Sequence, residues 1–89
     1  MKQHTKIYCD FFGYGEQSFI GCEVCGKEAT GGIHHLVFKS RSTVNPDRIE
    51  NIMALCSEHH RQAHDSTLSV ERLQQIHDTT MIIQDHINL

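Results

Sequence analysis

The 89-residue chain is long enough for one domain and too short to bury a large core. Apolar residues make up 38% of it, aromatic residues 7%, and there is no tryptophan, so we expect a disulfide, a metal or a partner to help stabilise the fold. The formal net charge of −3 argues against a strongly basic nucleic-acid binder. The N-terminus lacks the apolar segment of a secretory signal, and no apolar run is long enough to cross a membrane. We therefore expect a cytoplasmic protein with no membrane partner.

The N-terminal segment, residues 1–21, is expected to form an arm that precedes the rest of the domain. Apolar residues between positions 7 and 20 alternate loosely with polar ones, and Gly13 and Gly15 separate them. This pattern favours a short strand or extended arm followed by a turn. Residues 22–26, CEVCG, then resemble a metal knuckle, in which two ligands flank a tight turn and Gly26 is free to adopt a positive φ.

The middle of the chain predicts two short strands and a helix. Residues 33–38 and 51–55 are rich in β-forming side chains, and a polar stretch with the single proline joins them as a loop. Residues 57–65 contain no helix breaker and predict a helix that begins directly after Cys56. A second helix is expected in the C-terminal segment, 66–89, with Ser69 as its N-cap and a stripe of apolar residues at Val70, Leu73, Ile76 and Ile83.

Four residues have the spacing of a zinc site. Cys22 and Cys25 form one pair at C-x2-C spacing, and Cys56 and His59 form a second pair further along the chain. In a reducing compartment, such pairs indicate a closed tetrahedral structural zinc site rather than disulfides, although ordinary buried cysteines are an alternative. Cys9 is either a substitute for His59 as the fourth ligand or an ordinary half-buried thiol, and we favour the second interpretation.

A second set of polar residues lies between and just after the zinc ligands. His60 and His64 are four residues apart on the predicted helix, so they share one face, whereas His59 is rotated by about 100° from His60. His34 and His35 are neighbours on a strand and should point to opposite faces unless the strand is irregular there. Taken singly, each of these residues and Asn51 has an ordinary explanation, as a solvated, packed or turn residue. Their joint placement among zinc ligands favours a functional site.

Residues 22–64 resemble the HNH nuclease family, whose fold is the ββα-metal finger. The resemblance rests on Cys22-x2-Cys25, His34-His35, Asn51, and Leu55-Cys56-x2-His59-His60 followed by His64. The all-histidine set is similar to that of the DNase colicins. The resemblance implies a single α+β domain over residues 1–89: a small, zinc-stapled, treble-clef-like ββα finger with an extra C-terminal helix.

The resemblance also implies a role for each residue. His35 is expected to be the general base, with Asn51 holding it through backbone hydrogen bonds, and Arg41 is the candidate phosphate contact. A catalytic divalent metal is expected on three histidines, and a structural Zn²⁺ on the four zinc-site residues. Many members have Asp at the position of His34, so the histidine favours Mn²⁺, Ni²⁺ or Zn²⁺ over Mg²⁺. The ligands of the catalytic metal are His34, His60 and His64.

The sequence therefore predicts a metal-dependent endonuclease that hydrolyses or nicks DNA, as small members of this family do in phages, mobile elements, restriction and repair. The negative net charge predicts weak DNA affinity or help from a protein partner or a homodimer. The first alternative is a catalytically silent zinc module that binds nucleic acid or protein. A second is a structural zinc protein within a larger complex. The first alternative would need the zinc ligands but not His34, His35 or His64, and the low basic charge of the chain favours the second.

Overall fold

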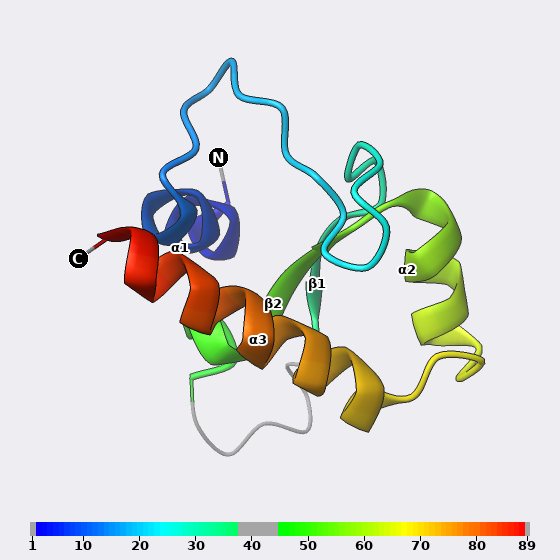
Figure 1. The fold of residues 1–89 in the computed structure, drawn as a ribbon. Helices are drawn as coiled ribbons and strands as arrows, with labels where there is room; N and C mark the ends of the chain where they lie inside the picture. The colour runs from blue at the N-terminus through cyan, green and yellow to red at the C-terminus, as the bar shows by residue number, and fades with distance from the viewer. Residues whose placement is uncertain (1, 38–44, 89) are drawn as a thin grey trace.

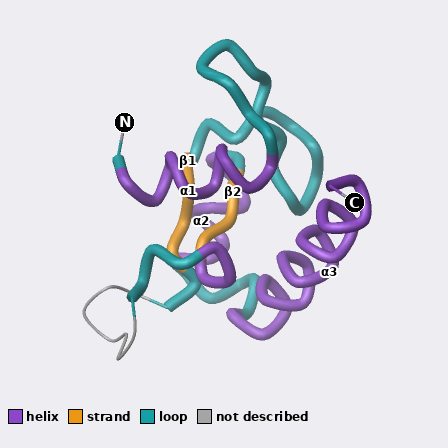
Figure 2. The backbone as a smooth tube through the Cα atoms, turned by 90° about the vertical axis from the view of Figure 1, so that its left-hand side faces the viewer, coloured by secondary structure: helices purple, strands orange, loops and turns teal. Residues whose placement is uncertain are grey.

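Two antiparallel strands and three α-helices make up the computed structural model, which describes residues 2–37 and 45–88 (Figure 1). Helix α1 spans Gln3–Phe12, strand β1 spans Gly32–His35 and strand β2 spans Ile52–Leu55. The remaining elements are the short 3-10 helix η2 and the helices α2 and α3, which span Ile49–Asn51, Ser57–His64 and Val70–Asn88. Figures 1 and 2 both place the β-hairpin between α1 and α2, with α3 along a third side. The predicted small α+β, ββα-like fold with an extra C-terminal helix is confirmed.

Strand β2 is buried on both of its faces, which explains its uninterrupted apolar sequence. All four of its residues have no exposed surface. Ile52 and Ala54 pack with Tyr8 of α1, whereas Met53 and Leu55 pack in a second cluster with Leu73 of α3. Successive side chains therefore enter two different cores, as the alternation of a strand requires.

The register of the hairpin determines where the two adjacent histidines of β1 lie. His34 pairs with Met53 and His35 pairs with Ile52. Paired residues in an antiparallel ladder project from the same face. His34 therefore lies on the face of Met53, and His35 on the opposite face, where Ile52 meets α1. The pairing is continuous over all four residues, so the strand does not have the irregularity that would bring both side chains to one face.

Helix α2 begins directly after Cys56, as predicted, and the predicted N-cap Ser69 precedes α3. The Cys56 Sγ atom accepts a hydrogen bond from the His59 backbone N–H at 3.5 Å, and Ser69 Oγ accepts one from the Arg72 N–H at 3.1 Å. The predicted apolar stripe of α3 is only partly correct. Leu73 is buried, but Val70 and Ile83 are 48% and 57% exposed. One turn after Leu73, the polar residue His77 is buried instead.

The prediction of a strand or extended arm near the N-terminus was wrong, because residues 3–12 form helix α1. Gly13 ends the helix in a left-handed conformation, with φ of 75°, and its N–H donates to the Cys9 carbonyl. The loose alternation of apolar residues conceals a helix whose buried residues are Tyr8 and Cys9. Within residues 2–37 and 45–88, every helix is too short or too polar to cross a bilayer.

Candidate functional site

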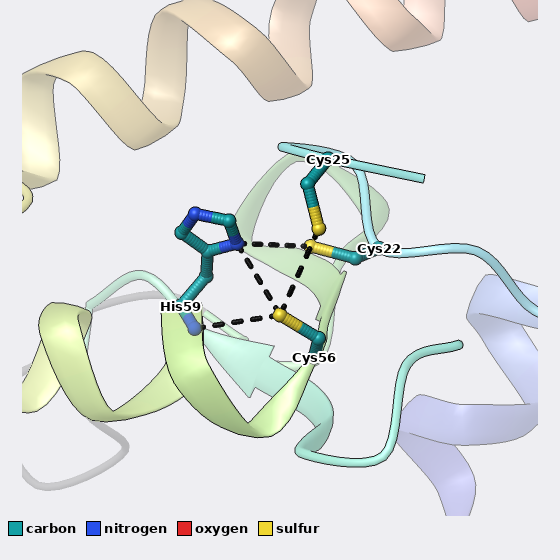
Figure 3. A group of neighbouring side chains, drawn as sticks. All are labelled: Cys22, Cys25, Cys56 and His59. Atoms are coloured by element: carbon teal, nitrogen blue, oxygen red, sulfur yellow. Dashed lines mark hydrogen bonds between the residues drawn. The ribbon is translucent and has the colours of Figure 1, made fainter. Parts of the chain in front are cut away.

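The cysteine cluster, defined as Cys22, Cys25, Cys56 and His59, has the dimensions of a tetrahedral zinc site (Figure 3). The Sγ atoms of Cys25 and Cys56 are 3.8 Å apart, and His59 Nδ1 is 3.3 Å from Cys56 Sγ and 3.7 Å from Cys22 Sγ. Tetrahedral Zn–S and Zn–N bonds would place two sulfurs about 3.8 Å apart and a sulfur and a nitrogen about 3.5 Å apart. The four donors therefore fit a zinc ion in their centre, with no ligand position left over.

Local backbone structure brings these four donors together. The knuckle closes through the Gly26 N–H, which donates to the Cys22 carbonyl at 2.8 Å, and Gly26 has a φ of 81°. The backbone N–H of His59 is the largest of several hydrogen bonds that lower the pKa of Cys56 to about 7, although burial opposes them. A thiolate is the form that binds zinc. The cluster is thus chemically prepared for the metal as well as geometrically suitable.

The histidine cluster, defined as His34, His60 and His64, combines one residue of β1 with two residues of α2. The ring centroids are 4.6 Å apart for His60 and His64, 5.2 Å for His34 and His60, and 5.7 Å for His34 and His64. One donor atom from each ring lies within 4.8 Å of the others. The close approach of β1 to α2 depends on Gly31, because a Cβ there would lie 2.7 Å from His60 Cβ. The sequence-predicted set is therefore brought together.

The surroundings keep this cluster ready to bind a metal. Burial is the largest of the causes that lower the pKa of His34 to about 4, and the neighbouring His60, His64 and His35 contribute to the same shift. Burial and His64 also lower the pKa of His60. At neutral pH His34 and His60 are therefore uncharged, which is the form that donates a lone pair to a metal. The three rings, with Ile33 and His35, line an open depression of about 200 Å³, so a metal here would keep an accessible side.

His35 faces a different group of residues from those that His34 meets. Its Nε2 atom donates to Asp47 Oδ1 at 2.7 Å, and its ring lies 4.6 Å from that of His4 on α1. His35 and Asp47 are both mostly buried, with side chains 14% and 13% exposed. Since Asp47 engages Nε2, Nδ1 is the ring nitrogen that remains to accept a proton. His35 also borders the depression of the histidine cluster, so it lies between both groups.

Asn51 connects the end of β1 to the segment that carries Asp47. The amide is buried, its oxygen accepts from the Val37 N–H at 2.8 Å, and its nitrogen donates to the carbonyls of Val37 and Pro46 at 3.1 and 2.9 Å. Val37 is two residues after His35, and Pro46 directly precedes Asp47. These bonds span the ends of the loop, so Asn51 helps to place the histidine and the carboxylate opposite each other. Arg41, the predicted phosphate contact, lies outside the described residues.

Sequence reasoning missed three features of this region. Asp47 stands in an ordinary turn sequence, and His4 lies in a segment predicted to be an arm. The third feature is a buried network that involves the zinc knuckle. Glu23 accepts hydrogen bonds from Tyr8 Oη at 2.7 Å and from His77 Nδ1 at 2.9 Å, and His77 Nε2 donates to the Ile49 carbonyl at 2.6 Å. None of these pairs has a recognisable sequence spacing, because each joins distant segments.

The protonation of His77 follows from its partners. Burial alone would lower its pKa, but the hydrogen bond and negative charge of Glu23 outweigh burial, and the pKa is raised. Both ring nitrogens face oxygen acceptors, which a doubly protonated imidazole satisfies. The network therefore holds a buried charged pair that joins α3 to Glu23, one of the two residues between Cys22 and Cys25.

Comparison with models of known protein families gives a match to the part of the chain that contains both clusters. A family model described as HNH endonuclease matches residues 22–66, just over half of the chain. The match includes the cysteine cluster, the histidine cluster, His35, Asp47 and Asn51, whereas His4 precedes it. No curated protein and no solved structure matches the chain.

Proposed function

This chain belongs to the HNH endonuclease family, and we propose that it is a metal-dependent endonuclease that hydrolyses or nicks DNA phosphodiester bonds. The observation that carries the proposal is the depression where His35 meets three converging imidazoles. Phosphodiester hydrolysis needs a base near neutral pH and a cation opposite the developing negative charge. The depression can supply both within one small volume.

The histidine cluster is the proposed site of the catalytic metal. His34, His60 and His64 would hold it, and three protein ligands leave positions open for water and a phosphate oxygen. A divalent cation bound there would supply Lewis-acid stabilisation of the phosphate charge. An all-imidazole set favours Mn²⁺, Ni²⁺ or Zn²⁺ over Mg²⁺. Zn²⁺ in the cysteine cluster would be structural, because that cluster has no open position.

His35 is the proposed general base, and its environment supports this role. Nδ1 would take a proton from the attacking water, and the resulting positive charge would lie 2.7 Å from the Asp47 carboxylate. Asp47 is thus a positioning residue that also stabilises the protonated ring, in the way that a buried aspartate supports histidine bases elsewhere. Asn51 supports both residues through the loop ends. Arg41 stays our proposal for a phosphate contact.

Plasmid cleavage by the purified protein tests this proposal. Zinc-loaded protein is incubated with supercoiled DNA and with Mg²⁺, Mn²⁺, Ni²⁺ or Zn²⁺ in turn, and nicked and linear products are quantified. His35→Ala should lower the rate by about 10²–10⁴-fold while leaving fold and zinc content intact, since a base acts mainly in the transition state. His86→Ala, an exposed histidine on α3, is the matched control and should cut normally.

Two results would contradict the proposal. If His35→Ala cuts within a few-fold of the wild-type rate, another group is the base. If no metal supports cleavage by folded, zinc-loaded protein, the alternative of a catalytically silent zinc module is favoured. DNA binding by such a protein would then distinguish a nucleic-acid module from a purely structural one.

A further inference from the structure

The group formed by His4, His35 and Asp47 contains a residue that the proposed reaction does not use. His4 comes from α1, His35 from β1 and Asp47 from the segment before η2, and all three are partly buried. One donor atom from each lies within 4.8 Å of the others. They border an open depression of about 530 Å³, which is also lined by Lys2, Gln3 and Ile33. Three elements thus bring two imidazoles and a carboxylate to one opening.

This donor set is suited to a divalent metal of intermediate softness. Two imidazoles and one carboxylate are a recurrent zinc-binding combination, and the open side leaves room for water as a fourth ligand. Asp47 also contributes a negative charge, which the histidine cluster lacks. Two nitrogen or oxygen ligands on one zinc lie about 3.3 Å apart. His35 Nε2 and Asp47 Oδ1 are now 2.7 Å apart, so they would have to separate by only about half an ångström to bind one zinc.

We propose that His4, His35 and Asp47 form a second, inhibitory metal site that takes Zn²⁺, Co²⁺ or Ni²⁺ and removes His35 from the reaction. The inhibitory part of this inference depends on the proposed function. A neutral imidazole has one nitrogen lone pair, and the other nitrogen carries a proton. When a metal takes that lone pair, whichever nitrogen it uses, the ring cannot accept a proton from water.

The arrangement gives the two histidine-containing sites opposite effects on cleavage. A metal on His34, His60 and His64 would activate, whereas a metal on the opposite face of β1 would inhibit. Cleavage should therefore rise and then fall as Zn²⁺ is increased. The inhibited form would require no change of fold, because the three inhibitory donors already lie together.

Metal binding measured without DNA tests the site independently of nuclease activity. Protein purified without a histidine tag and loaded with one structural zinc is titrated with Co²⁺ by calorimetry and visible absorption. The wild type should bind two further Co²⁺ ions, and His4→Gln should bind one. Loss of a residue that only hydrogen-bonds to a metal ligand lowers metal affinity by roughly 10–100-fold. Loss of His4, a direct ligand in this proposal, should lower Co²⁺ affinity by more than that. Asp47→Asn keeps the side-chain size and should give the same loss, whereas His86→Gln should retain both ions.

Cleavage at rising Zn²⁺ supplies the second readout, with each rate expressed relative to the same variant's maximum. The half-inhibitory Zn²⁺ concentration should increase at least about tenfold in His4→Gln. Unchanged Co²⁺ stoichiometry together with unchanged Zn²⁺ inhibition in this variant would overturn the inference, even if the wild type is a nuclease. If the second Co²⁺ ion is lost in His4→Gln but no metal supports cleavage, the metal site is upheld and the proposed function fails.

Discussion

Helix α2 contributes to two groups of side chains that could bind a metal, and these groups differ in their surroundings. His59 joins three cysteines in a closed set of four, whereas His60 and His64 join His34 in an open set of three beside His35. The helical rotation of about 100° per residue is sufficient to send His59 and His60 to different groups. The comparison suggests a division of roles: the closed set stabilises the fold, and the open set is accessible to a substrate.

Cys56→Ala should produce the largest effect, because Cys56 belongs to the cysteine cluster that could hold zinc and is also the N-cap of α2. Metal binding free energy is folding free energy in domains of this size, so we expect the variant to be largely unfolded. Circular dichroism and zinc content check this. Cys9→Ala is the matched control, since Cys9 is a buried cysteine outside the cluster. If Cys56→Ala melts cooperatively at the same temperature as Cys9→Ala, the cysteine cluster does not stabilise the fold.

His77→Phe tests whether the buried network belongs to the same stabilising region. The variant leaves the Glu23 carboxylate buried without its cationic partner, which typically costs about 3–5 kcal/mol. Because the wild-type pKa of His77 is raised, its stabilising effect should be complete below about pH 6.5 and lost as pH rises through the folded-state pKa. Urea unfolding of wild type and variant at several pH values measures the loss of stability and its pH dependence. If the difference in free energy of unfolding between wild type and variant grows with pH instead, His77 and Glu23 do not form a charged pair.

His64→Ala and His60→Ala should each weaken the activating metal while leaving zinc in the cysteine cluster. We expect a loss of affinity of at least about 10–100-fold, because each variant removes one of three ligands. Calorimetric titration with Mn²⁺ or Ni²⁺, beside zinc analysis of the same samples, makes the measurement. Wild-type affinity in both variants would mean that this helix face is only a solvated surface. Simultaneous loss of zinc would mean that the two groups are not independent.

The smallest expected effect concerns pH. Because burial and neighbouring histidines lower the pKa of His34 to about 4, its neutral, ligating form is lost only as pH falls toward that value. An unperturbed imidazole would lose about fourfold in neutral population at pH 6. We therefore expect Mn²⁺ affinity to fall less between pH 7.5 and 6 than three unperturbed histidines would predict. Cleavage should depend on pH more steeply than metal affinity does, because the general base must also be unprotonated. If Mn²⁺ affinity and cleavage rate change with pH in the same way, the metal ligands and the general base are not separate groups.

Spacing along the sequence predicted those parts of the site that local geometry determines. The pairs Cys22 and Cys25, Cys56 and His59, and His60 and His64 each lie within one turn or one helical repeat, so their proximity follows from backbone geometry alone. The hairpin and α2 were predictable for the same reason. The resemblance of the motif to a known family supplied the expectation that the pairs meet.

The residues that were missed depend on contacts between distant segments. Asp47 reaches His35 only because Asn51 and the hairpin register place the loop end there. His77 is polar, and only the buried acceptors of Glu23 and Ile49 make its position in the core favourable. Helix α1 was mistaken for an arm because its weak apolar pattern is stabilised by packing of Tyr8 against β2. Tertiary contacts decide all three cases, and sequence spacing does not reveal them.

Controlled removal of metal tests the division between the two groups most directly. Zinc-loaded protein with added Mn²⁺ is titrated with a chelator while far-ultraviolet circular dichroism and plasmid cleavage are followed on the same samples. A division of roles between the two groups predicts two separate transitions: cleavage is lost first with the fold retained, returns when Mn²⁺ is restored, and the fold is lost only at higher chelator concentration. Loss of fold and cleavage together, in a single transition at one chelator concentration, would contradict it.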